Sequence, residues 1–214
     1  MGISKKDAIW VWTGITAALW LAWLILRLTI GGDCPRPELS STFDRTAYLG
    51  RWYEMFRDTT VPFESHDCAT ATYYALDPNY IDVNNIEYDT VNQEFPRGEE
   101  ATPARAQCSF YRNGHCQVKF FELSPWSDYK VIDTDLTSYS IVYGCDSFIA
   151  GMVKFEWLWV LTRDPLEVNS ADWTTMQNTV FPSIQSKLPN YDPNTRLRTN
   201  IQTTGSGCQY TAYP

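Results

Sequence analysis

Six cysteines and two histidines are the residues of this chain with the most versatile chemistry. The histidines are His66 and His115, and no two cysteines form a CxxC pair. A zinc site needs three or four clustered ligands, so the spacing predicts no metal site, and we expect no cofactor. The cysteines are Cys34, Cys68, Cys108, Cys116, Cys145 and Cys208. Their even number suggests three disulfides, for which spacing alone allows fifteen pairings.

The candidate nucleophiles and bases of the chain give little support for a catalytic site. The run His66-Asp67-Cys68 could indicate a nucleophile, but a thiol held in a disulfide cannot attack a substrate. With the cysteines paired, and neither histidine beside a matched partner, no side chain is left to act as a base near neutral pH. We therefore expect that the protein is not an enzyme.

The N-terminal residues 1–30 are predicted to form a transmembrane anchor. The stretch from Ala8 to Leu26 carries no charge, and as a helix it covers about 28 Å, close to the thickness of a hydrocarbon core. The alternative is a cleaved signal peptide, whose apolar core is usually about 7–15 residues long. Lys5 and Lys6 precede the apolar run, which favours an N-terminus on the inner side and residues 8–30 in the bilayer.

The rest of the chain is then expected on the oxidising side of that membrane, where disulfides form: the intermembrane space, an organelle lumen or the cell exterior. Residues 31–47, rich in Gly, Pro and Ser, are predicted to be a tether, and residues 48–214 suffice for a single domain. The chain has 17 Lys and Arg against 25 Asp and Glu, a net charge of −8. Proteins that bind nucleic acid carry basic patches, so we expect no such partner.

Short runs typical of β-strands recur along residues 48–214, with turn signals such as Asp77-Pro78-Asn79 and Asn113-Gly114 between them. This cadence predicts an antiparallel all-β sandwich or barrel. The expected strands are 51–56, 69–76, 80–88, 101–107, 117–123, 128–133, 139–143 and 157–162, with a last short strand near 197–202.

One helix is predicted between the last long strand and the final short one. Asn169 or Ser170 can cap its start. Apolar residues then follow at spacings of three and four, which is typical of one buried helix face, and Pro182 should kink or end the helix. The apolar residues are Trp173, Met176, Val180 and Ile184.

Three motifs in order resemble the signatures of the lipocalin family, and above all its apolipoprotein D-like and bacterial branch. Residues 50–52 (GRW) resemble the first signature. Residues 134–145, with Thr-Asp followed by YSIVYGC, resemble the second, and residues 159–165 (WVLTRDP) resemble the third. One residue departs from the pattern, because Leu136 stands where the family usually has an aromatic. The resemblance as a whole covers nearly everything from Cys34 to Cys208.

The resemblance implies an eight-stranded antiparallel up-and-down β-barrel with the C-terminal α-helix packed outside. The transmembrane helix predicted from the apolar N-terminal run would precede this barrel. In this family the tryptophan of the first motif plugs the closed end of the barrel, and the arginine of the third lies across it. Gly50, Trp52 and Arg163 are therefore assigned structural roles. A contact between the Arg163 guanidinium and the Trp52 ring would contribute roughly 0.5–2 kcal/mol.

The resemblance also implies a disulfide pairing. It matches Cys34 with Cys145 and Cys68 with Cys208, which leaves Cys108 to pair with Cys116 across one hairpin. A two-residue turn at Asn113-Gly114 would instead set Cys108 opposite Lys119, so this bridge requires a wider loop.

Alternation along the strands, aligned to the family pattern, predicts which side chains face the barrel interior. The alternative is that the same side chains fill a solid core. The residues expected to line a cavity are Ala71, Tyr73, Val118, Phe120, Tyr129, Val131, Ser140, Val142, Trp157 and Trp159.

A mostly apolar cavity with a few hydroxyls is what a small lipophile needs. We therefore expect a membrane-anchored protein that binds a small hydrophobic ligand, such as a fatty acid, sterol, isoprenoid, quinone or pigment. A second hypothesis is an accessory subunit of a larger membrane complex in mitochondria or plastids. An enzyme is the least favoured of the three hypotheses.

Overall fold

A computed structural model describes residues 5–29, 32–75, 80–96, 104–108, 113–119, 124–148, 151 and 153–212, and within the N-terminal helix it describes side chains only from Trp12 to Ile25. The chain divides into two compact units. One contains residues 1–35 and 145–156, and the other contains residues 36–144 and 157–214.

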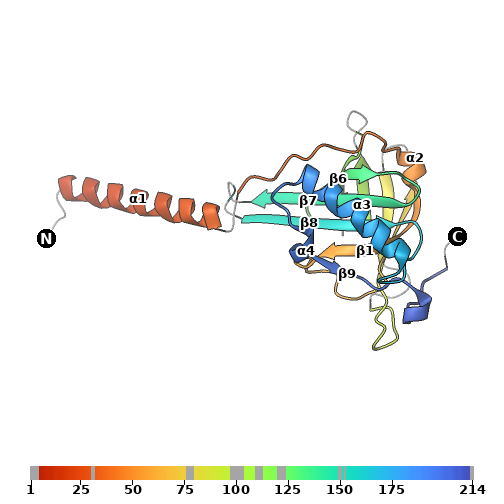
Figure 1. Cartoon of the computed structure of the whole chain (residues 1–214). Helices are drawn as coiled ribbons and strands as arrows, with labels where there is room; N and C mark the ends of the chain where they lie inside the picture. Colours follow the sequence, from red (N-terminus) through yellow and green to blue (C-terminus); the bar gives the residue numbers. More distant parts are fainter. Residues whose placement is uncertain are drawn as a thin grey trace. The chain divides into compact units, whose positions relative to one another are not determined.

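Eight antiparallel strands close on themselves as a barrel, because β1 pairs with both β2 and β8 (Figure 1). A short ninth strand, β9, adds to the far part of β1, and the expected up-and-down order is confirmed. The strands are β1 (Gly50–Asp58), β2 (Thr70–Ala75), β3 (Tyr80–Ile86), β4 (Ala104–Cys108), β5 (His115–Lys119), β6 (Ser127–Thr134), β7 (Tyr139–Phe148), β8 (Val153–Thr162) and β9 (Leu197–Thr199).

The long helix α3 (Ala171–Lys187) packs outside the barrel wall (Figure 1). Ser170 is its N-cap, and the Ser170 hydroxyl accepts a hydrogen bond from the Trp173 backbone N–H at 3.1 Å. The rings of Trp173 and Phe181 both lie against Phe56 of β1, with centroids 5.4 and 5.2 Å away. The helix continues through Pro182 to its last residue, so Pro182 does not end it.

Two four-residue helices flank the barrel strands. The first, α2 (Arg45–Tyr48), begins inside the segment that the sequence predicted to be a tether, and Asp44 caps it. The second, α4 (Pro193–Arg196), leads into β9, and a short 3₁₀ helix (Thr204–Ser206) follows.

The N-terminal helix α1 covers Lys5–Thr29. Within the described part of the chain, no helix is long and apolar enough to cross a membrane. The expectation of a transmembrane anchor in residues 8–30 is therefore not supported.

Three disulfides join the cysteines in the pairs that the resemblance implied: Cys34–Cys145, Cys68–Cys208 and Cys108–Cys116. Cys108 of β4 lies directly opposite Cys116 of β5 in the strand register. The hairpin therefore has a wider connection than a two-residue turn at Asn113-Gly114, as the bridge requires.

Candidate functional site

The closed end of the barrel is built around Trp52, which is fully buried. The Arg163 guanidinium carbon lies 3.7 Å from the centroid of the Trp52 ring. Arg163 also donates hydrogen bonds to the backbone carbonyls of Ala47, Leu49 and Leu136. Leu136, the residue that departs from the family pattern, takes a left-handed backbone conformation with φ of 68°, and its carbonyl remains available to Arg163.

Hydroxyl groups of three tyrosines and one serine form a hydrogen-bonded chain above Trp52. Tyr48 of α2 stacks on Trp52 with ring centroids 5.0 Å apart. The Tyr48 hydroxyl shares hydrogen bonds with Ser140 at 3.0 Å and with Tyr129 at 3.3 Å, and Tyr129 shares one with Tyr73 at 2.6 Å. Burial raises the pKa of all three tyrosines above the usual range of a phenol. The three phenol groups are therefore neutral at physiological pH.

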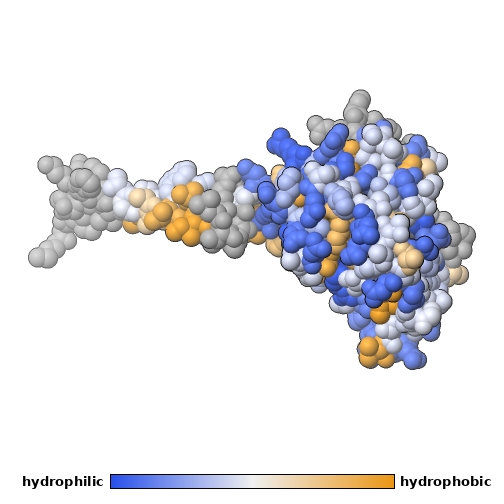
Figure 2. Space-filling model, viewed as in Figure 1, coloured by the Kyte–Doolittle hydropathy of each residue, from blue (hydrophilic) through white to orange (hydrophobic). Residues whose placement is uncertain are grey.

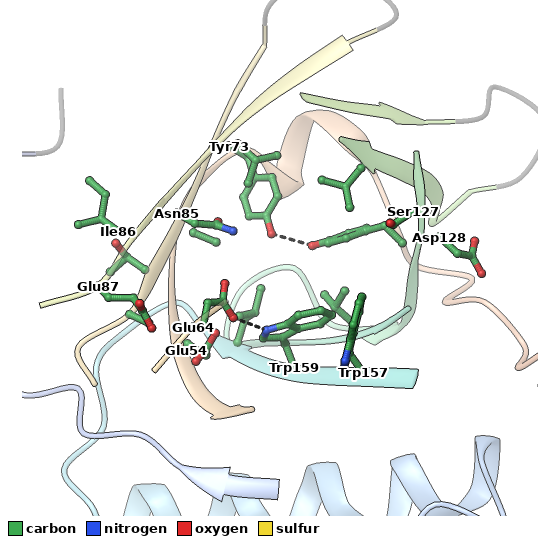
Figure 3. Close-up of a pocket in the computed structure, with 18 residues that line it drawn as sticks. Glu54, Glu64, Tyr73, Asn85, Ile86, Glu87, Ser127, Asp128, Trp157 and Trp159 are labelled. Atoms are coloured by element: carbon green, nitrogen blue, oxygen red, sulfur yellow. Dashed lines mark hydrogen bonds between the residues drawn. The ribbon is translucent and has the colours of Figure 1, made fainter. Parts of the chain in front are cut away.

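A cavity opens above the tyrosines, inside the barrel (Figure 3). Together with the open solvent at its mouth, it encloses about 680 Å³ of empty space. Its lining is mostly apolar, with three glutamate carboxyl groups at one side and Asp128 at the other. The described lining residues are Glu54, Glu64, Ala69, Thr70, Ala71, Tyr73, Val83, Asn85, Ile86, Glu87, Val118, Ser127, Asp128, Tyr129, Val142, Trp157, Trp159 and Leu161.

Most residues that strand alternation placed inside the barrel do line this cavity. They are Ala71, Tyr73, Val118, Tyr129, Val142, Trp157 and Trp159. Val131 and Ser140 do not line it, because they are fully buried in the layer below, where Tyr48 and Trp52 fill the closed end. Phe120 lies outside the described residues.

The carboxyl side of the cavity was not predicted, although one of its members carries a signal. Glu54 has the same strand parity as Trp52, which points inward, so alternation alone places Glu54 inside. A β-bulge between Glu54 and Phe56 then shifts the register by one residue. Glu54 pairs with Leu161 and Arg57 pairs with Trp159, both of which line the cavity, whereas Phe56 turns outward to α3.

Arg57 is the centre of a buried ion cluster beside the cavity, with 1% of its surface exposed. One guanidinium nitrogen, Nη1, lies 3.0 Å from Glu54, 3.0 Å from Glu87 and 3.6 Å from Glu64. The other, Nη2, donates to the His66 carbonyl oxygen at 3.1 Å. Burial, and then the negative charge of Glu64, hold the pKa of Glu54 well above its usual range. The Glu54 carboxyl group therefore favours its neutral form.

Glu64 reaches furthest into the cavity of these three side chains (Figure 3). It lies 2.9 Å from the Trp159 indole N–H, which donates a hydrogen bond to it. This bond fixes the orientation of an indole that forms one cavity wall. Within the described residues, no group of His, Cys, Asp and Glu is arranged to hold a metal ion.

Comparison with known proteins gives both family and fold matches. A family model described as a lipocalin-like domain matches residues 43–183. Apolipoprotein D from Rattus norvegicus is 34% identical over 140 residues, which cover 63% of this chain and 68% of that protein. Lazarillo protein from Schistocerca americana is 26% identical over 149 residues, which cover 70% of this chain and 69% of that protein.

Solved structures show the same architecture at lower sequence identity. Apocrustacyanin C1 aligns with a TM-score of 0.60 and 14% identity, over 86% of this chain and 93% of its own. Insecticyanin from the tobacco hornworm Manduca sexta aligns with a TM-score of 0.60 and 19% identity, over 85% of this chain and 93% of its own. At these identities the likeness concerns the fold alone.

Proposed function

The chain belongs to the lipocalin family, and from that premise we propose that its barrel binds one small hydrophobic molecule and releases it unchanged. The observation that carries this proposal is the cavity walled by Trp157, Trp159, Tyr73 and Tyr129. Burial of apolar surface favours binding by roughly 25 cal/mol per Å², so about 200 Å² of buried ligand surface contributes about 5 kcal/mol before the costs of association.

The proposal is tested with N-phenyl-1-naphthylamine, a neutral apolar dye that fluoresces more strongly away from water. We expect saturable binding at one site per chain. Ala71→Phe should weaken binding at least tenfold, because it puts a ring into the cavity from its wall. Ala171→Phe is the matched control, since Ala171 is exposed at the start of α3, and it should bind as the wild type does. An absence of saturable binding, or equal affinity in both variants, would contradict the proposal.

The working compartment is proposed to be an oxidising one. All six cysteines are held in disulfides, and such bonds persist in secreted, lumenal and periplasmic surroundings. In a reducing compartment the bond between Cys68 and Cys208, which ties the C-terminal segment to the barrel, would be lost. Alkylation of unreduced protein from its native source should label no cysteine.

A second candidate function is that of an accessory subunit in a larger assembly, and α1 is the observation that favours it. Large apolar side chains are exposed along this helix (Figure 2), among them Trp12, Leu19 and Trp20, each more than 60% exposed. Exposed apolar surface of this kind marks interaction sites. We propose that α1 packs against helices of another protein.

The second candidate is tested by the mass of the full chain purified from its source in mild detergent. A particle heavier than one chain supports the second candidate if the double substitution Trp12→Ser and Trp20→Ser reduces its mass to that of one chain. Thr13→Ser on the same helix is the control. A lone monomer would contradict it and would leave ligand binding unaffected.

A further inference from the structure

We propose that the cavity selects an amphiphile whose polar group is a protonated amine, and that it discriminates against a carboxylate on the same tail. This inference rests on the proposed function, because it names the class of ligand that the same cavity takes. The feature that carries it is the one-sided placement of Glu54, Glu64 and Glu87 along an otherwise apolar lining (Figure 3).

The sign of the charge at the cavity wall is the first step. Among the described lining residues there are four acidic side chains and no Lys, Arg or His. The fourth acid, Asp128, is paired with Lys130 and lies 3.0 Å from His115 Nε2. The three glutamates on the opposite side therefore decide which charged group the cavity accepts.

Arg57, the cation that the described residues place beside those glutamates, does not serve a ligand. Arg57 is not on the cavity lining, it is buried, and its Nη1 already lies among all three carboxyl groups. Even with Glu54 neutral, as the upward shift of its pKa favours, one guanidinium faces both Glu64 and Glu87. Among the described residues, three carboxyl groups thus share one guanidinium in a water-poor place, where charge interactions are stronger than in bulk water.

Hydrogen-bond complementarity points in the same direction. Asn85 lines the cavity and points into it (Figure 3). Its Oδ1 atom is buried and has no hydrogen-bond partner within the described part of the chain. Such an atom needs a donor from a ligand or a water molecule. An ammonium group carries three donors and no acceptor, whereas an ionised carboxylate carries only acceptors. The ammonium group therefore complements both Asn85 and the glutamates.

The remaining lining accommodates the tail of such a ligand. Val118, Val142 and Leu161 are aliphatic, and the hydroxyls of Tyr73 and Tyr129 satisfy each other at 2.6 Å. No second charged group is therefore needed at the other end of the ligand. The inferred ligand is a small hydrophobic amine, lying with its nitrogen toward Glu64.

The test compares decylamine, decanol and decanoate, three ligands with the same ten-carbon tail. Each displaces N-phenyl-1-naphthylamine from the full chain at neutral pH, below its micelle concentration. We expect decylamine to bind at least tenfold more tightly than decanoate, with decanol in between. The inference would be overturned if decanoate bound as tightly as decylamine. It would also be overturned if decanol bound as tightly as decylamine, because the charge of the ligand would then not affect its affinity. If neither the dye nor any of the three ligands binds, the proposed function fails as well.

Substitutions assign the preference to the glutamates. Glu64→Gln keeps an oxygen that can accept from the Trp159 indole but removes the charge, and it should reduce the ratio of decylamine to decanoate affinity at least threefold. Glu87→Gln is the second variant, should the first not fold, and the same reduction is expected. Glu38→Gln removes an exposed charge away from the lining and should leave the ratio unchanged. An unchanged ratio in a folded Glu64→Gln or Glu87→Gln protein would overturn the inference.

Discussion

The Arg163 guanidinium lies over the Trp52 indole, 3.7 Å from the ring centroid, and joins three separate backbone segments to the closed end of the barrel through hydrogen bonds. Those segments are the end of α2, the residue before β1, and the turn between β6 and β7. A planar group with five donors can stack and bond in several directions at once. One side chain thus joins the plug of the barrel to the loops around it.

Replacing Arg163 with lysine should destabilise the protein by about 1–3 kcal/mol. Lysine keeps the positive charge but loses the planar stacking and most of the hydrogen bonds to carbonyl oxygens. Urea denaturation monitored by tryptophan fluorescence measures the change. Arg105→Lys is the matched control, because 63% of the Arg105 side chain is exposed, and it should change stability by less than about 0.5 kcal/mol. Equal losses in both variants would contradict a special role for Arg163.

The disulfides should contribute unequally to stability. Cys68 and Cys208 are 140 residues apart, whereas Cys108 and Cys116 are 8 apart. A cross-link that closes a longer loop removes more entropy from the unfolded chain. Replacing the first pair with serines should therefore cost about 2 kcal/mol more than replacing the second pair. Urea denaturation of the two double variants under non-reducing conditions provides the comparison, and a larger cost for the short loop would contradict the expectation.

The raised pKa of Glu54 predicts a pH dependence of stability. A carboxyl group whose pKa is raised on folding keeps its proton after the unfolded chain has lost it. Its stabilising contribution is complete below the unfolded pKa, near 4.5, and is lost as the pH rises through the folded-state pKa. The free energy of unfolding of the wild type, minus that of Glu54→Gln, should therefore fall as the pH is raised from about 5 to neutrality.

Glutamine is a suitable comparison because it resembles the protonated form and can still accept from the Asn200 side chain, which donates to Glu54. Glu38→Gln is the exposed control, and the same difference taken against it should stay constant over this pH range. A difference for Glu54→Gln that rises with pH would mean that Glu54 is stabilised as an anion.

Strand alternation was enough to predict much of the cavity, because it depends only on the two-residue period of each strand. Trp157, Trp159 and Leu161 share one parity with Arg163, and all three line the cavity. The outward neighbours Leu158 and Val160 are fully buried all the same, as expected of a wall covered by a helix. Ser170 as the helix cap was predictable for a similar local reason, since a hydroxyl there can accept from the first free N–H groups.

The buried ion cluster depends on features that alternation does not reveal. The bulge in β1 turns Arg57 inward, and the residues around it, Glu54, Met55 and Phe56, include no glycine or proline to mark the irregularity. Glu64 and Glu87 come from outside β1 and meet Arg57 only in the folded barrel. The hydrogen-bonded tyrosines next to Trp52 were not predicted for a different reason. Tyr48 follows a polar stretch that is typical of a tether. Its burial depends on packing against Phe43, Trp52 and Tyr73.

Gly114, at the start of the hairpin arm that carries Cys116, should not tolerate a side chain. Its φ of 78° lies in the left-handed region, and a Cβ atom there would stand 2.9 Å from the Val131 carbonyl oxygen of β6. The two backbones are held close because the Val131 N–H donates to the Gly114 carbonyl oxygen at 2.7 Å. Gly114→Ala should therefore destabilise the protein by about 1–3 kcal/mol. Gly205→Ala is the control, since a Cβ atom at Gly205 would have no neighbour within 4 Å, and its loss in urea denaturation should be clearly smaller. Equal stability of the two variants would mean that β6 moves away from residue 114 at little cost.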